Sequence, residues 1–136
     1  GLVGSHANSI EPDKRMLSSM TPTIVENPEG NLFLVLGTPG GSTIITTIAQ
    51  IITNVVDFDM SLKESIESKR FHHQWLPDVI QIEKNSLGKD VIDNLILYGH
   101  DIKYRSSIGE ANCILINGNL KFGCSDSRRG SVAIGY

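Results

Sequence analysis

The sequence has few of the features that mark several functional classes. Its 136 residues include two cysteines, Cys113 and Cys124, so neither a disulfide framework nor a four-ligand zinc site is available. No apolar run approaches the roughly 20 residues that span a bilayer, and no signal peptide is visible from Gly1 to Gly4. The net charge of −3, with scattered basic residues, argues against a nucleic-acid or anionic-membrane partner.

What is present indicates one folded α/β domain. The length suffices to bury a core, and 40% of the residues are hydrophobic. Hydrophobic periodicity predicts a mixed, mostly antiparallel sheet with packed helices. The predicted strands are 23–26, 31–36, 79–83, 101–105, 113–116 and 120–124, and the predicted helices are 43–56, 61–70 and 87–98. The segments 1–17 and 71–77 are expected to be irregular.

The chain is organised around a glycine corner, defined here as residues 37–42 (GTPGGS). An apolar strand leads into it, and an amphipathic helix with Ser42 as its predicted N-cap leads out. Free backbone N–H groups at such a corner suit a negatively charged oxygen, whether of a phosphate, a carboxylate or an acyl-transfer oxyanion. Many strand–glycine–helix corners are only connections, and spacing alone leaves that alternative open.

Two adjacent hydroxyls, Ser18 and Ser19, lie just before the first predicted strand. Both can point into a site if the backbone bends there, and serine hydroxyls hydrogen-bond carboxylates. A Ser/Thr-rich turn is the plainer interpretation and, on the residues alone, the favoured one.

Two other pairs of polar residues are assigned to structure. His72 and His73 are adjacent and have no third ligand at a standard spacing, so packing or a hydrogen-bonded loop is favoured over a metal site. No metal or cofactor is expected. Thr46 and Thr47 fall inside the predicted helix, where hydroxyls bond back to the preceding turn, so neither is a candidate nucleophile.

Residues near the second predicted hairpin suggest local pairing. A turn centred on Gly118 would place Cys113 and Cys124 opposite each other. Two free thiols are favoured there over a strained cross-strand bond. Asp126 and Arg128 are expected to form a local ion pair that ties the tail to the core.

Three motifs together resemble the γ-glutamyltranspeptidases (γ-glutamyltransferases). The segment Lys14–Val25 (KRMLSSMTPTIV) resembles the family's substrate-carboxylate segment, and the glycine corner with Ile44–Thr47 resembles its oxyanion-hole turn and following helix. Arg70–Asp78 (RFHHQWLPD) is similar to a signature of bacterial members, and Gly135-Tyr136 matches how many of them end. The resemblance spans essentially the whole chain, in order and at compatible spacing.

The resemblance implies a fold and a reaction. Members of this family are N-terminal nucleophile (Ntn) hydrolases with a four-layer αββα core, made as one precursor that cleaves itself into a large and a small subunit. The new N-terminal threonine of the small subunit attacks the γ-glutamyl amide of glutathione or a related compound. The γ-glutamyl group then passes to water, an amino acid or a peptide.

The resemblance also implies roles for particular residues. By position, Ser18 and Ser19 match the serines that hold the α-carboxylate of the glutamyl group. Gly40 and Gly41 match the glycines whose N–H groups form the oxyanion hole. The nucleophilic threonine, the acidic residues that grip the α-amino group and the arginine that binds the α-carboxylate match no residue of this chain.

Other family positions carry weaker implications. Only packing is assigned to His72, His73 and Trp75. Thr38 stands where many members have serine, a mild change. Ser127 replaces a proline that is common in the family's Asp-Pro-Arg.

Residues 1–136 are therefore expected to be the C-terminal part of the small subunit of a bacterial member, without its nucleophile. The expected partners are the large subunit, the N-terminal part of the small subunit of the same precursor, and glutathione or another γ-glutamyl substrate. A periplasmic or secreted location is inferred from the family alone. The alternatives are a non-catalytic binding or structural module derived from the family, and a related acylase or poly-γ-glutamate-processing enzyme.

Overall fold

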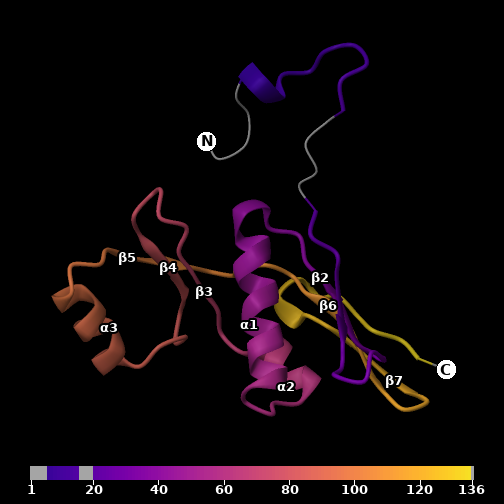
Figure 1. Ribbon diagram of the computed structural model, residues 1–136. Helices are drawn as coiled ribbons and strands as arrows, with labels where there is room; N and C mark the ends of the chain where they lie inside the picture. The colour runs from indigo at the N-terminus through magenta and orange to yellow at the C-terminus, as the bar shows by residue number, and fades with distance from the viewer. Residues whose placement is uncertain (1–5, 16–19, 136) are drawn as a thin grey trace.

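The computed structural model describes residues 6–15 and 20–135 and contains two sheets. One has four antiparallel strands in the order β1-β2-β6-β7, and the other has three strands in the order β3-β4-β5. Helix α1 stands between them (Figure 1). The predicted mixed α/β class is confirmed, with the strands divided between two sheets. Within these described residues, no helix has the length and apolarity needed to cross a bilayer.

Most predicted elements form close to their expected bounds. The strands are β1 Thr23–Glu26, β2 Leu32–Gly37, β3 Phe71–His72, β4 Ile80–Glu83, β5 Ile102–Arg105, β6 Asn112–Asn117 and β7 Leu120–Ser125. The helices are α1 Ile44–Val56, α2 Leu62–Glu67 and α3 Lys89–Leu97, with short 3-10 turns η1 His6–Asn8, η2 Gly41–Thr43 and η3 Ser127–Arg129. Strand β3 corrects the prediction of an irregular segment 71–77, because Phe71 and His72 pair with β4.

One face of the four-stranded sheet packs against α1 and α2. Alternate strand residues face opposite sides, so Leu34, Leu36 and Cys113 point toward the helices. The buried cluster consists of Leu34, Leu36, Ile44, Ile48, Ile51, Val55, Leu62, Ile66, Ala111 and Cys113. Most of the predicted apolar stripe of α1 is therefore buried, but Ile45 and Val56, which the helical pattern also placed in it, are 69% and 52% exposed. The opposite face of the sheet carries Ile24 and Ile114, which are 68% and 44% exposed, so an apolar face remains uncovered.

The two helix starts differ in how well the sequence predicts them. Ser61 and Glu64 form the predicted capping box at the start of α2, each side chain bonding the other's backbone N–H. Ser42, in contrast, is not the N-cap of α1. It lies inside η2, and Thr43 takes the cap position with its hydroxyl donating to the Gly40 carbonyl at 3.0 Å.

The three-stranded sheet is built around a crossover. Strands β4 and β5 are parallel, a geometry that needs a long connection, and α3 supplies it. Gly99 follows the C-cap of α3 with φ 92°, as the sequence predicts for a glycine that ends a helix.

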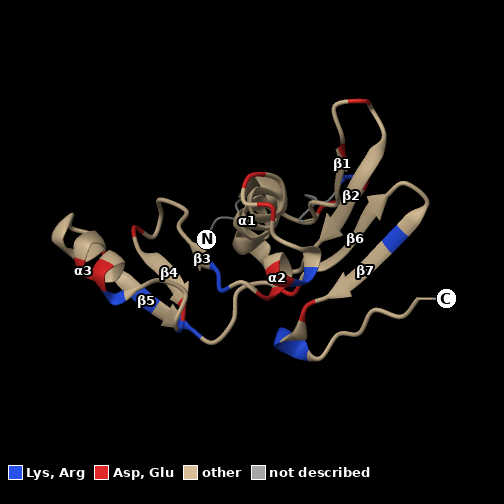
Figure 2. Ribbon diagram, turned by 90° about the horizontal axis from the view of Figure 1, so that it is seen from below, with Lys and Arg blue, Asp and Glu red and all other residues tan. Residues whose placement is uncertain are grey.

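Four buried charged side chains connect this sheet with the end of the other, and we call them the charge cluster. Arg70 precedes β3, Glu83 ends β4, and Asp126 and Arg128 follow β7. Arg70 Nη1 lies 2.8 Å from Asp126 Oδ2, and Arg128 Nε lies 2.7 Å from Glu83 Oε1. The predicted Asp126–Arg128 ion pair is confirmed, with Arg128 Nη1 lying 3.0 Å from Asp126 Oδ1. Figure 2 shows acidic and basic segments meeting between α2 and the end of β7.

The charge cluster also holds the loop between β5 and β6. Glu83 accepts hydrogen bonds from the N–H groups of Arg70 at 3.0 Å and Ile108 at 2.7 Å. Arg70 donates to the Ile108 carbonyl at 2.8 Å, and Asp126 accepts from the Ala111 N–H at 3.1 Å. Buried carboxylates are tolerated here because each one is both paired and hydrogen-bonded.

The pKa values of the two carboxyl groups follow from these contacts. Burial alone would raise the pKa of Glu83, but hydrogen bonds from Arg128, Arg70 and Ile108 lower it overall. Burial would also raise the pKa of Asp126, but hydrogen bonds from Arg128, Ala111 and Arg70 lower it overall. Both carboxyl groups therefore stay charged well below neutral pH.

The two cysteines face each other across the β6–β7 hairpin, as predicted. Cys113 pairs in register with Cys124, and Gly118 lies in the turn with φ 58°. Both are free thiols, Cys113 buried and Cys124 half-buried. Burial raises the pKa of Cys113 to about 12, so its reactive thiolate form is scarce at neutral pH.

The lowered carboxyl pKa values predict a loss of stability in acid. Unfolded Asp and Glu titrate near pKa values of about 3.9 and 4.3. Since the folded values are lower, the stabilisation is complete above about pH 5 and is lost as the pH falls through 4 toward the folded values. Melting temperatures measured from pH 7 to pH 3 should show this decline.

The variant Asp126→Asn tests whether the charge cluster stabilises the fold. It leaves buried guanidinium groups with one carboxylate fewer, so we expect about 3–5 kcal/mol of destabilisation at pH 7 and a weaker dependence on acid. Glu29→Gln, which changes an exposed carboxylate in the β1–β2 turn, is the control. Equal melting temperatures for the two variants would contradict the proposed importance of the charge cluster.

Candidate functional site

The glycine corner joins β2 to α1 through two glycines of positive φ. Gly40 has φ 150° and ψ 3°, and Gly41 has φ 58°. A Cβ on Gly40 would collide with Thr43 Oγ1, whereas the space around Gly41 is open. Gly40 is thus required by both conformation and packing, and Gly41 by conformation alone.

The corner presents backbone donors at the start of a helix. No described residue accepts a hydrogen bond from the N–H of Gly40 or Gly41, and both glycines are exposed. The helical residues begin at Gly41 in η2 and continue into α1, whose dipole adds partial positive charge at this end. Donors and dipole together suit a negatively charged oxygen.

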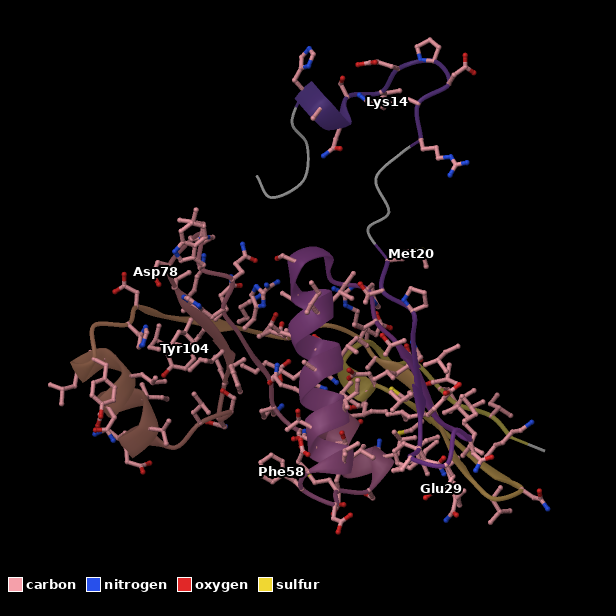
Figure 3. All side chains as sticks on the ribbon, in the orientation of Figure 1. Lys14, Met20, Glu29, Phe58, Asp78 and Tyr104 are labelled. Carbon is pink, nitrogen blue, oxygen red and sulfur yellow. The ribbon has the colours of Figure 1, made fainter. Side chains whose placement is uncertain are left out.

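A pocket of about 550 Å³ opens over the corner. Its lining residues are Met20, Thr21, Pro22, Gly37, Thr38, Pro39, Gly40, Gly41, Ile44 and Asn112. None of these described lining residues is charged, so attraction for an anion comes from backbone dipoles. Figure 3 shows Met20 and Glu29 at opposite ends of the β1–β2 hairpin, with Met20 at the end that carries the corner.

The predicted carboxylate-binding serines, Ser18 and Ser19, lie outside the described residues. The residues that directly follow them, Met20 to Pro22, line the pocket. The structure therefore brings the chain leading away from the serine motif to the glycine corner. The serine contacts themselves stay a prediction.

A comparison with protein families covers the whole chain. The family model described as gamma-glutamyltranspeptidase matches residues 1–136. The chain belongs to the γ-glutamyltranspeptidase family. Among curated relatives, the glutathione hydrolase proenzyme of Escherichia coli (strain K12) is 42% identical over 130 residues, covering 94% of this chain and 22% of the relative. The chain thus spans about a quarter of the length of the curated relatives it matches.

Solved γ-glutamyltranspeptidases have the same fold. An acivicin-inhibited γ-glutamyltranspeptidase is 46% identical with a TM-score of 0.86, over 95% of this chain and 70% of that one. The γ-glutamyltranspeptidase from Pseudomonas nitroreducens complexed with L-DON is 42% identical with a TM-score of 0.87, over 100% and 72%. These similarities confirm the expected Ntn-hydrolase fold class.

In this γ-glutamyltranspeptidase-family chain, His72 is a structural residue, as predicted. It is 1% exposed, and both ring nitrogens are hydrogen-bonded. Nδ1 lies 2.8 Å from the Thr46 hydroxyl on α1, and Nε2 lies 2.8 Å from the Gln74 side-chain oxygen. His72 therefore fixes β3 against α1.

His73 fits the prediction of a hydrogen-bonded loop, whereas the packing predicted for Trp75 is not seen among the described residues. His73 is exposed and pairs with Asp78 at 3.0 Å. Trp75 is 74% exposed, and its φ of 69° belongs to a tight turn in which the Leu76 N–H donates to the Gln74 carbonyl at 2.9 Å. The sequence motif alone does not reveal this turn.

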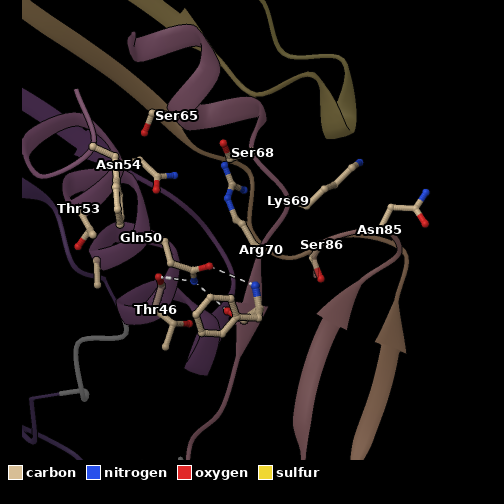
Figure 4. Close-up of a pocket in the computed structure, with 13 residues that line it drawn as sticks. Thr46, Gln50, Thr53, Asn54, Ser65, Ser68, Lys69, Arg70, Asn85 and Ser86 are labelled. Atoms are coloured by element: carbon tan, nitrogen blue, oxygen red, sulfur yellow. Dashed lines mark hydrogen bonds between the residues drawn. The ribbon is translucent and has the colours of Figure 1, made fainter. Parts of the chain in front are cut away.

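A larger cavity, of about 760 Å³, lies beside α1 (Figure 4). Gln50 spans part of it, accepting from the Phe71 N–H at 3.2 Å and donating to the Phe71 carbonyl at 2.8 Å. Its described lining includes Arg70 and Lys69 but no residue of the glycine corner. We take the smaller pocket as the candidate site, because among the described residues it is the one of these two pockets that contains the free backbone donors of Gly40 and Gly41.

Sequence reasoning missed two residues at the corner. Thr38, noted only as a mild replacement of serine, accepts the Glu110 N–H at 2.8 Å. Asn112 lies opposite Gly37 on the neighbouring strand β6 and lines the pocket. The hydroxyl that Thr38 shares with serine was the available signal for Thr38. No local feature of the sequence points to Asn112.

The geometry predicts different stability losses for the two glycines. Gly40→Ala combines backbone strain with the Thr43 collision and should cost about 1–3 kcal/mol. Gly41→Ala meets open space and should cost about 1 kcal/mol, from φ alone. Thermal unfolding measures both. Gly37→Ala, in open space at negative φ, is the control, and a stability loss there as large as for Gly40→Ala would contradict the strain and the Thr43 collision as its cause.

Proposed function

We propose that this chain is part of a γ-glutamyltranspeptidase (glutathione hydrolase) and supplies the oxyanion hole through the N–H groups of Gly40 and Gly41. The observation that carries the proposal is the pair of exposed donors at the start of α1, in a pocket bordered by the chain that follows the serine motif. Family membership and the fold support it. Phosphate is not favoured, because no lysine or arginine is among the described lining residues.

The proposed reaction is acyl transfer through a threonine ester. A threonine hydroxyl oxygen, supplied by another segment of the same precursor, attacks the γ-carbonyl carbon of a γ-glutamyl amide. The carbonyl oxygen becomes an oxyanion, which Gly40 and Gly41 stabilise with two hydrogen bonds. The C–N bond then breaks, the proton from the threonine goes to the departing amine, and water or an amino acid accepts the γ-glutamyl group in the second half of the reaction.

The proposal extends to the remaining parts of the enzyme. Residues 1–136 act as the C-terminal portion of the small subunit, and Ser18 and Ser19 hold the substrate α-carboxylate. The large subunit and the rest of the small subunit complete the site and cover the apolar face around Ile24 and Ile114. The proposed location is periplasmic or secreted, as the family resemblance implies.

A matched pair of variants tests the oxyanion assignment in the complete protein. Gly41 and Gly118 share φ 58°, and both have open space where a Cβ would lie. Gly41→Ala should displace a donor and lower kcat for γ-glutamyl-p-nitroanilide roughly 10²-fold. Gly118→Ala, with the same strain in the distant β6–β7 turn, should keep kcat. Equal kcat values would overturn the assignment, and a complete wild-type protein without turnover would favour the non-catalytic module.

A second variant tests the predicted serine contacts. Ser18→Ala with Ser19→Ala removes two hydrogen bonds to the substrate carboxylate, each worth about 1 kcal/mol or more. We expect KM for the γ-glutamyl donor to rise at least about 10-fold, while self-cleavage and the melting temperature change little. Steady-state kinetics and gel analysis of subunit formation measure these effects. Unchanged KM and kcat would contradict the carboxylate assignment.

A further inference from the structure

One hydroxyl connects the glycine corner to a distant segment. Thr38 Oγ1 accepts the Glu110 N–H at 2.8 Å and donates to the carbonyl of Pro39 at 2.8 Å. Pro39 directly precedes Gly40, so this bridge acts on the backbone next to the first proposed donor. The segment that supplies Glu110 is the β5–β6 loop, defined as residues 106–111.

The β5–β6 loop contacts the corner at a second point. Gly109 has φ 71°, and a Cβ on it would lie 3.0 Å from Thr38 Oγ1 and 2.8 Å from Thr47 Oγ1. Thr47 is fully buried on α1. The backbone at Gly109 therefore lies against both sides of the corner, the strand side at Thr38 and the helix side at Thr47.

The loop is itself fixed by buried charges. The N–H and carbonyl of Ile108 bond to Glu83 and Arg70, and the N–H of Ala111 bonds to Asp126. Hydrogen bonds to charged partners are about twice as strong as neutral ones. The two residues between Ile108 and Ala111 are thus anchored on both sides, and they are the residues that meet the corner.

We propose that Thr38 and the β5–β6 loop position the backbone of the oxyanion hole, adding to the bonds from Thr43 to the Gly40 carbonyl, with the charge cluster as their anchor. Gly40 and Gly41 have no side chains that can hold their own backbone in place. Donors help an oxyanion only if they are preorganised, and a misplacement of about 1 Å can cost about 10²-fold in rate. This inference rests on the proposed function, but the contacts that carry it can be tested separately.

Thr38→Val in the complete protein is the decisive variant. Valine keeps the shape of threonine and removes the acceptor for the Glu110 N–H. We expect kcat for γ-glutamyl-p-nitroanilide to fall roughly 10- to 100-fold, with KM within about 2-fold, because the lost alignment acts in the transition state. Thr38→Ser keeps the hydroxyl and should retain kcat within about 3-fold. Thr53→Val, on the part of α1 remote from the corner, controls for a threonine-to-valine change that does not touch the corner.

Hydrogen–deuterium exchange gives a readout that does not need catalysis. In Thr38→Val, peptides covering 37–44 and 106–111 should exchange faster than in the wild type, and in Thr38→Ser they should not. Faster exchange with unchanged kcat would show that Thr38 does not position the donors for catalysis. Unchanged exchange would show that the Thr38 hydroxyl does not hold the corner against the β5–β6 loop. If the complete wild-type protein shows no turnover, the proposed function is overturned, and the catalytic role of Thr38 falls with it. The exchange measurement still decides whether Thr38 holds the corner in place.

Discussion

The pairing of four buried charges constrains this structure more than any other interaction. A buried carboxylate or guanidinium group is tolerated only when it is paired and hydrogen-bonded. Arg70, Glu83, Asp126 and Arg128 are paired with nearest contacts of 2.7–3.0 Å, and among the described residues the buried Nε of Arg70 is the one guanidinium nitrogen of the cluster without a partner. Because the four come from both sheets, the charges are satisfied only when the sheets are docked. The charge cluster therefore makes the relative position of the two sheets a condition of folding.

The chemistry proposed for the corner depends on that constraint indirectly. The charge cluster does not line the pocket, but it fixes the loop that meets Thr38, and Thr38 adjoins the Pro-Gly-Gly backbone. The described pocket lining is uncharged, so backbone N–H groups and the α1 dipole provide the favourable potential. Preorganised backbone donors of this kind stabilise the negative charge that develops on an oxygen during acyl transfer. This agrees with the oxyanion proposed as its ligand.

Local patterns in the sequence predicted the elements that local physics determines. The apolar stripe of α1, the Ser61–Glu64 capping box and the Cys113–Cys124 register each depend on residues that are close together in sequence. The division into two sheets, the strand β3 and most of the charge cluster depend on contacts between distant segments, which spacing does not reveal. At the site, the glycine corner was predictable from its residue types. The supporting contact of Thr38 was not, because its partner is Glu110.

Gly109 sets a limit on how this corner can evolve. A side chain at that position would disturb Thr38 and Thr47 together, whatever its polarity, and φ 71° adds its own cost. The sequence of the pocket wall can therefore change at exposed positions such as Asn112 far more freely than at Gly109, which does not line the pocket. Substitutions should therefore be tolerated on the exposed pocket wall more readily than at the glycine behind it.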